Sequence, residues 1–424
     1  MAALRRKAIA VCLALLFTAP SALGGPTLVF DAGTGEVISQ DRAGEPWYPA
    51  SLTKLMTSYV VFQKIKAGTL KLDQKVTVSE LAARQPPSKL GMRAGSEITV
   101  DLALQVLLVY SANDMAYVLA EAAGGTAQNF VQEMNANARR LGMTATYFAN
   151  PNGLFDPRQV TTARDIGLLA ATIRKEFPEY AHYFAEPYVA VGKRRLMNRN
   201  ALIRQMNNAD GMKTGFVCNS GYNLVASASD DGRKAIAVIL GASSGKARSD
   251  LAQMLLTSAL SRLELSATPE PRPRLETIPN SALGKLVPAD LTTLVCKGKG
   301  ATLARASTLS GWGISLGRYD TALTADMALR GRLLGAREIL AGGSSGVVKD
   351  PSGQGFSAMV WDLDQTSSLS LCGFFREQSA YCEVMTPEGF AAIAAIAAAS
   401  EKTPPVSQGD DSAPPRKKRK AKKK

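Results

Sequence analysis

Short apolar runs in the middle of the chain predict β-strands. Residues 222–228 and residues 235–240 both have the composition of strands, and the sequence Asp230-Asp231-Gly232 between them is typical of a tight turn. Together they predict a β-hairpin. The preceding segment, residues 211–216, is expected to form an edge strand, beside which an extended peptide can add.

Two segments nearer the N-terminus, one at Ser51 and one at Ser111, carry local structural signals. Pro49 favours a helix that begins near Ser51, because proline is well tolerated just at a helix start. Residues 107–114 lie between two apolar stretches and contain a polar break that begins at Ser111. A break of this kind predicts a loop whose side chains project into a cleft.

The C-terminal third has a different pattern. Residues 268–273 are rich in proline, which predicts an extended linker, and we assign residues 266–305 to it. Beyond the linker the pattern predicts a strand, a helix, two strands, a helix and a strand, the order of a split, ferredoxin-like βαββαβ domain. These six elements are expected at residues 311–319, 322–340, 346–348, 356–361, 368–375 and 381–384.

The first residues predict export. Arg5, Arg6 and Lys7 precede an apolar run, residues 8–17, which is followed by small residues up to Gly24. This is typical of a cleavable secretory signal over residues 1–24, since the run is too short to span a membrane. A leader that is retained as a membrane anchor is the alternative.

Charge changes the picture less than its total suggests. The chain has 424 residues, 46% hydrophobic and 20% charged, with a net charge of +14, which indicates a globular protein large enough for two domains. Residues 416–424 carry eight positive charges and the leader carries three, so subtracting both from 14 leaves +3 for the rest. We therefore expect no nucleic-acid partner.

The basic run ends a tail, residues 401–424, that is expected to be disordered. The tail could contact an anionic membrane surface or wall carboxylates, or remain solvated without a partner.

Three short motifs carry the candidate chemistry, and each would be a weak signal alone. Their order and wide spacing match the signature of serine acyl-transfer enzymes. The motifs are Ser51-Leu52-Thr53-Lys54, Ser111-Ala112-Asn113 and Lys213-Thr214-Gly215. A serine nucleophile needs a base, usually histidine. The only histidine in the sequence, His182, has no serine or cysteine motif beside it. A lysine can serve instead if burial and nearby positive charge lower its pKa.

The spacing of the first motif suits this chemistry. Residues i and i+3 share one face of a helix, so Lys54 Nζ is expected to reach Ser51 Oγ, and the helix dipole would help to keep the amine neutral. Ser111 would relay protons, and Asn113 would hold a substrate amide. On the edge strand, Lys213 and Thr214 would bind the terminal carboxylate of the peptide. Gly215 would permit close backbone approach.

With these motifs in place, residues 26–265 resemble the D-alanyl-D-alanine carboxypeptidases, low-molecular-mass penicillin-binding proteins of the S11 serine peptidase type. The resemblance extends to residues 48–57, 150–154, 198–200 and 221–225. It implies an α/β (α+β) fold with an antiparallel sheet and a helical cluster, as in β-lactamases and transpeptidases. It also implies acylation of Ser51, an oxyanion hole formed by the N–H groups of Ser51 and Phe216, and a basic residue, Arg248, near the carboxylate site. Phe216 departs from relatives that have small or hydrogen-bonding residues there, which puts substrate preference in doubt.

The expected partners follow from the resemblance. They are peptidoglycan stem peptides and β-lactam inhibitors, encountered in the periplasm, either at the cell wall or peripherally on the cytoplasmic membrane. Endopeptidase cleavage of crosslinks, β-lactam hydrolysis and a weakly active wall-binding scaffold remain alternatives. No element resembles the glutamate-bearing loop of class A β-lactamases, so a penicillin adduct is expected to be long-lived.

The C-terminal segment has a weaker resemblance. Residues 306–390, whose first strand contains Trp312 and Tyr319, look like a SPOR domain, a module that binds peptidoglycan glycan strands. A small appendage without separable function is the alternative.

Four cysteines remain after the leader is removed, and an even number in an exported chain suggests disulfides. Cys372 and Cys382 could meet across the turn between the last helix and strand. Cys218 and Cys296 could pair if the linker folds back on the Lys213 strand, or could remain free thiols. No spacing resembles a metal site, and we expect neither metal nor cofactor.

Overall fold

The computed structural model describes residues 25–265, 272–280, 288–296, 303–336, 339–340, 342–350, 355–377 and 380–401. The expected signal peptide and almost all of the expected basic tail lie outside these residues. Among the helices that are described, none combines the length and apolar character needed to cross a membrane.

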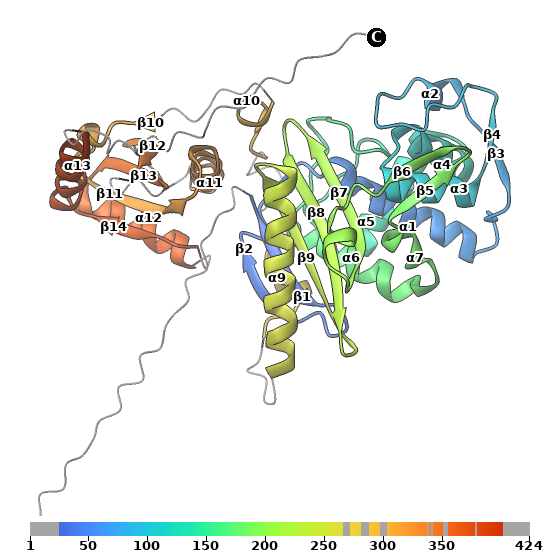
Figure 1. The fold of residues 1–424 in the computed structure, drawn as a ribbon, viewed down its shortest axis with the longest axis horizontal. Helices are drawn as coiled ribbons and strands as arrows, with labels where there is room; N and C mark the ends of the chain where they lie inside the picture. The colour runs from blue at the N-terminus through green and yellow to red at the C-terminus, as the bar shows by residue number, and fades with distance from the viewer. Residues whose placement is uncertain are drawn as a thin grey trace, which may run out of the picture.

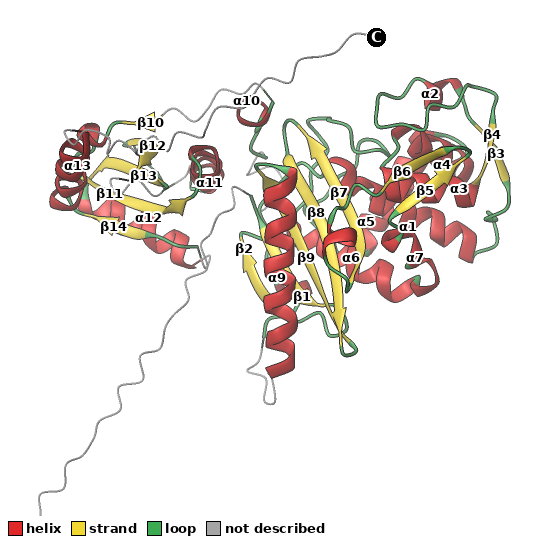
Figure 2. Ribbon diagram, viewed as in Figure 1, coloured by secondary structure: helices red, strands yellow, loops and turns green. Residues whose placement is uncertain are grey.

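A five-stranded antiparallel sheet forms the centre of the larger domain (Figures 1 and 2). The strand order is β2-β1-β9-β8-β7. The strands are β1 (Thr27–Asp31), β2 (Val37–Asp41), β7 (Ala209–Val217), β8 (Gly221–Asp230) and β9 (Arg233–Ala242). Asp230 pairs with Arg233, and Asp231 and Gly232 form the two-residue turn with positive φ values of 44° and 75°, as hairpin turns of this length require. The predicted hairpin is therefore confirmed, and β7 is an edge strand as expected.

Helices cover both faces of this sheet. The long helix α9 (Gly245–Leu265) packs on the face that presents Val29, Leu224 and Ile239. The opposite face presents Leu28, Phe30 and other apolar side chains to the helical cluster, because successive strand residues point to opposite faces. The main helices of the cluster are α1 (Thr53–Lys66), α4 (Asn113–Gly124), α5 (Ala127–Arg140) and α6 (Ala163–Glu176). This arrangement confirms the expected mixed fold class.

Shorter elements complete the domain. They are η1 (Ala50–Leu52), β3 (Lys75–Thr77), α2 (Glu80–Ala83), β4 (Glu97–Thr99), α3 (Val100–Gln105), η2 (Val106–Tyr110), η3 (Pro178–Tyr180), α7 (His182–Ala185), β5 (Tyr188–Val191), β6 (Arg194–Met197) and α8 (Leu202–Gln205). Strands β3 and β4 form one two-stranded sheet, and β5 and β6 form another.

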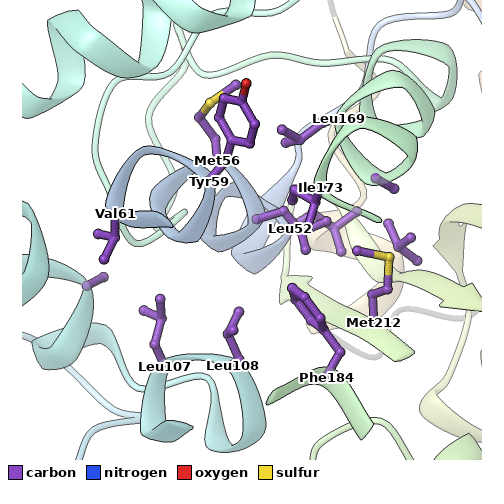
Figure 3. Packing of buried hydrophobic residues seen from close by; sticks show 14 of the residues in the cluster. Leu52, Met56, Tyr59, Val61, Leu107, Leu108, Leu169, Ile173, Phe184 and Met212 are labelled. Carbon is purple, nitrogen blue, oxygen red and sulfur yellow. The ribbon is translucent and has the colours of Figure 1, made fainter. Parts of the chain in front are cut away.

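Helix α1 lies at the centre of the helical cluster. Every residue from Thr53 to Phe62 is buried, as expected of a helix enclosed on all sides rather than lying at the surface. Figure 3 shows Leu52, Met56 and Tyr59 of this region among side chains from neighbouring helices and from β7. The first motif is therefore held by a densely packed element.

The prediction of an extended linker over residues 266–305 is wrong in part. Within residues 266–305, the described stretches 272–280 and 288–296 pack on the larger domain through η4 (Leu275–Thr277) and α10 (Thr292–Val295), and Leu275, Ile278 and Leu291 are buried. A disulfide joins Cys218 to Cys296, and Leu291 N donates to Asn219 O at 3.0 Å. Apolar side chains in this stretch are buried on the larger domain, which the proline-rich composition alone did not reveal.

The C-terminal part has its own sheet, with strand order β10-β12-β13-β11-β14 and a separate hydrophobic cluster. Its elements are β10 (Leu303–Ala304), η5 (Ala306–Thr308), β11 (Trp312–Tyr319), α11 (Ala322–Gly335), β12 (Ser344–Lys349), β13 (Phe356–Leu363), α12 (Gln365–Glu377), β14 (Glu383–Met385) and α13 (Pro387–Glu401). The order from β11 to β14 is the expected one, although α11 ends earlier than expected. A disulfide joins Cys372 to Cys382.

Three elements of this part, β10, η5 and α13, were not expected from the sequence. Strand β10 adds to β12 in parallel, and α13 places the buried Phe390 against the sheet beside Gly313. The two domains also touch, because Met327 of α11 belongs to the hydrophobic cluster of the first domain.

Candidate active site

Ser51 lies in the single turn η1 that leads into α1, and Lys54 lies in the first turn of α1. Lys54 Nζ donates to Ser51 Oγ at 2.9 Å, to Asn113 Oδ1 at 2.8 Å and to the carbonyl oxygen of Asn152 at 2.6 Å. The contact expected from the spacing of the first motif is thus present, and the amine is directed at the hydroxyl by two further acceptors.

The surroundings of Lys54 favour its neutral form. The side chain is fully buried, and burial lowers the pKa of Lys54 to about 7; the negative charge of Asp114 opposes this in part. Asp114 is itself buried and accepts hydrogen bonds from the backbone N–H groups of Leu90 and Gly91. A lysine with such a pKa can accept a proton near neutral pH. Burial and nearby positive charge were the expected causes; burial is the one that lowers the pKa of Lys54 here, and the charge that acts on it, Asp114, is negative.

The second motif follows the π-helical turn η2. Ser111 ends this turn in the left-handed conformation, with φ of 67°, and Asn113 begins α4. The side chain of Asn113 is bonded at both ends, since Oδ1 accepts from Lys54 and Nδ2 donates to Pro86 O at 2.9 Å. Asn113 therefore orients the lysine, a contact that was not expected from the sequence, where a substrate amide was the expected partner.

The third motif lies on the edge strand β7. Lys213 is buried and donates to Thr214 O at 3.0 Å. Burial, and after it the positive charges of Lys54, Arg248 and Arg199, hold the pKa of Lys213 well below its ordinary value. An anion bound beside this group would relieve the repulsion.

Gly215 allows the nucleophile turn to lie against this strand. A Cβ atom on Gly215 would come within 2.9 Å of Pro49 O and 3.3 Å of Ala50 Cβ. The close approach expected at this glycine is therefore made by the turn that carries Ser51.

Two further residues of the sequence analysis lie beside the strand. Arg248, on α9, is buried and donates from Nη1 to Asn223 O at 3.3 Å; burial lowers its pKa to about 10. Phe216 is 42% exposed, and its ring packs against Tyr222 with centroids 4.3 Å apart.

Residues of all three motifs line one cavity of about 360 Å³. Its lining includes Ser51, Ser111, Asn113, Thr214, Gly215, Phe216 and Arg248. Lys54 and Lys213 are buried behind this lining. The structure thus brings together residues that are up to 197 positions apart in the chain, from Ser51 to Arg248.

Several residues of the site had no role assigned from the sequence, and three of them make notable contacts. Asn152 supplies a backbone acceptor to Lys54, and Gly153 lies so close to Ala50 that a Cβ atom would be 2.0 Å from its carbonyl oxygen. Arg199 lines the cavity, with its guanidinium 4.4 Å from the ring centroid of Tyr110. All three lie in segments that carried the family resemblance, which was the available signal.

A search of the described residues finds no group of three or more histidine, cysteine, aspartate or glutamate side chains that could hold a metal ion.

The fold and this site place the chain in a known class. Residues 17–244, more than half of the chain, match the D-alanyl-D-alanine carboxypeptidase family, and the chain belongs to this family. It is 37% identical over 246 residues to the D-alanyl-D-alanine carboxypeptidase DacC of Escherichia coli, covering 56% of this chain and 62% of that protein. It is 34% identical over 258 residues to DacA of Haemophilus influenzae, covering 60% of this chain and 66% of that protein. The match thus spans slightly less than two thirds of these curated relatives.

Solved structures give the same class. The D-alanyl-D-alanine carboxypeptidase DacD from Francisella tularensis superposes with a TM-score of 0.55 at 32% identity, over 61% of this chain and 74% of that one. Penicillin-binding protein D2 from Listeria monocytogenes, in its cefotaxime-bound form, superposes with a TM-score of 0.51 at 28% identity, over 56% of this chain and 97% of that one.

Proposed function

We propose that this protein is a serine D-Ala-D-Ala carboxypeptidase, which removes the terminal D-alanine from peptidoglycan stem peptides through an acyl-enzyme on Ser51. The observation that carries the proposal is the contact between Lys54 and Ser51. An amine whose pKa is about 7 lies 2.9 Å from a serine hydroxyl that lines an open cavity. That arrangement is the activated nucleophile which acyl transfer requires.

In the first half-reaction, Lys54 takes the proton of Ser51 as Oγ attacks the carbonyl carbon of the penultimate D-alanine. The negative charge that forms on the carbonyl oxygen is stabilised by the backbone N–H groups of Ser51 and Phe216. The C–N bond then breaks, Ser111 relays the proton held by Lys54 to the leaving nitrogen, and D-alanine departs. In the second half-reaction water attacks the ester and gives a proton to Lys54. Lys54 then returns this proton to Ser51 Oγ as the ester C–O bond breaks.

Substrate binding uses the edge of the sheet. β7 has a partner strand on one side only, so an extended peptide can add beside it through backbone hydrogen bonds. Its terminal carboxylate would lie near Thr214, Lys213 and Arg248, where the repulsion between buried cations is relieved by a negative charge. β-Lactams would acylate the same serine.

The C-terminal part has a separate proposed role. We propose that residues 306–390 hold the exported protein to glycan strands of the wall. Beside α13, its sheet carries a groove of about 180 Å³. The groove is lined by Arg318, Lys349, Asp350, Tyr381 and Glu383 among others, a mixture of charged and aromatic side chains that suits a polar ligand with apolar faces.

The main proposal is tested by labelling the purified protein with a fluorescent penicillin and mapping the adduct. The label is expected on the Ser51 peptide and should be absent from Ser51→Ala, provided that the variant keeps its thermal transition. Incubation with a pentapeptide that ends in D-Ala-D-Ala, and in parallel with a crosslinked dimer, separates carboxypeptidase from endopeptidase by product mass. Label retained in Ser51→Ala would overturn the assignment.

A further inference from the structure

The side chain of Asn223 is fully buried on β8, the strand next to β7. Its Nδ2 donates to Tyr48 O at 2.9 Å and to Pro49 O at 3.2 Å. Its Oδ1 accepts from Gly241 N at 2.9 Å. Both hydrogens of the amide are therefore directed at the two carbonyl groups that immediately precede the nucleophile turn.

The backbone of the same residue reaches the other side of the site. Asn223 is the direct partner of Gly215 in the pairing of β7 with β8, and its carbonyl oxygen accepts from Arg248 Nη1 at 3.3 Å. One residue thus links the nucleophile turn, the edge strand and the arginine of α9.

These links bear on the geometry of the oxyanion hole. Its two proposed donors, the N–H groups of Ser51 and Phe216, come from separate segments that are distant in sequence. Ser51 N lies two residues after Pro49, through Ala50, whose φ of 49° is unusual for a residue with a side chain. Phe216 N follows Gly215. The separation of the two donors is therefore set by whatever joins these segments, and Asn223 bonds to one and pairs with the other.

We propose that Asn223 is a positioning residue that sets the spacing of the two oxyanion donors, an inference that rests on the proposed acylation of Ser51. A buried amide is unfavourable in a sheet unless it is fully hydrogen-bonded, and here all its bonds are satisfied by contacts across the site. An apolar residue of similar size would fill the space but could not hold the turn. Donors must lie within about 2.7–3.1 Å of the oxyanion to stabilise it, so a small movement of the turn matters.

The test compares two variants on the same strand. Asn223→Asp keeps the shape and the acceptor for Gly241 N–H but loses the donors to Tyr48 O and Pro49 O. Ser227→Ala is the matched control, because Ser227 is also buried on β8 but its hydroxyl bonds to Asp210 and Arg174 rather than to the nucleophile turn.

The measurement is the time course of labelling over a range of concentrations of a fluorescent penicillin. It gives the limiting acylation rate, the concentration at half that rate, and the final labelled fraction. For Asn223→Asp we expect a limiting rate lowered by about 10²-fold, the size of effect seen when reacting groups are displaced by about 1 Å, with an unchanged half-saturating concentration and full final labelling. Ser227→Ala should acylate at the wild-type rate.

Each outcome decides the matter. A wild-type limiting rate in Asn223→Asp overturns the inference. So does a lower labelled fraction at an unchanged rate, because that pattern reports loss of folded protein only. Should Asn223→Asp fail to fold, Asn223→Ser replaces it, because its hydroxyl is too short to reach both carbonyls. It is expected to show the same slow and complete labelling. A wild-type acylation rate in Asn223→Ser would also overturn the inference. Absence of label on the wild type would instead refute the proposed function.

Discussion

The lowered pKa of Lys54 makes a quantitative prediction about pH. At its ordinary pKa of 10.5, about one lysine side chain in 3,000 is neutral at pH 7, whereas with a pKa of about 7 about half are neutral. Burial thus raises the concentration of the competent base by about 10³-fold at neutral pH, which corresponds to about 4 to 5 kcal/mol at 1.36 kcal/mol for each tenfold step.

The test measures the second-order rate constant for acylation by a penicillin as a function of pH. This constant reports the pKa values of groups on the free enzyme. Acylation should rise from about pH 5, pass its midpoint near pH 7 and level off above about pH 8, as Lys54 loses its proton. In Lys54→Arg the guanidinium stays protonated throughout, so the rate should fall by about 10² or more and the midpoint near pH 7 should vanish.

Lys213 is the necessary control, because its pKa is lowered too. Lys213→Arg should bind substrate less well but retain the midpoint. A flat wild-type profile between about pH 6 and 8 would show that titration of Lys54 does not control acylation. A midpoint that survives in Lys54→Arg and disappears in Lys213→Arg would transfer the role of base to Lys213.

Three further outcomes are expected. Asp114→Asn removes the negative charge that raises the pKa of Lys54, so the acid limb of the acylation profile should move below pH 7; a limb moved to higher pH would contradict this. A penicillin adduct should persist for minutes or longer while the peptide substrate turns over, as followed by intact mass; equal turnover of both would favour a β-lactamase. The full chain should sediment with purified glycan strands and still do so after deletion of residues 402–424, but not after deletion of residues 306–401. Binding that follows the basic tail and is lost at moderate salt would indicate electrostatic attraction.

The sequence was most informative where chemistry demands particular side chains. The three motifs were recognisable because the proposed roles of nucleophile, base and carboxylate-binding group each require a particular side chain. In the structure Ser51, Ser111 and Thr214 line one cavity, and Lys54 and Lys213 are buried. The hairpin was predictable for a different reason: a two-residue turn with positive φ values restricts which residues can occupy it.

Other parts of the site depend on the backbone and leave little trace in composition. The acceptor that Asn152 offers to Lys54 is a carbonyl oxygen, which every residue has. The left-handed conformation of Ser111 follows from a π-helical turn that no apolar periodicity signals. The amide of Asn223 could be recognised as important only once its partners, 174 and 175 positions away, were known.

The C-terminal region shows the limit of pattern analysis in another way. The periodicity predicted the strands and helices between Trp312 and Met385 in their correct order. It did not predict α13, because a helix rich in alanine carries a weak amphipathic signal, and it did not show that residues near Leu275 and Leu291 pack on the first domain. Those contacts depend on partners distant in the chain.

The disulfide between Cys218 and Cys296 has a mechanical consequence. Cys218 directly follows β7, and Cys296 lies on the segment that leads to the C-terminal domain. A pulling force on that domain therefore passes through the sulfur bridge to the end of β7, and bypasses α9 and the residues between it and Cys296. If the C-terminal domain is held by the wall as proposed, tension in the wall would load β7, the strand proposed to bind the substrate. Reduction of the bridge would leave the same load to noncovalent contacts of residues 288–296 with the first domain, such as the buried Leu291 and its hydrogen bond to Asn219.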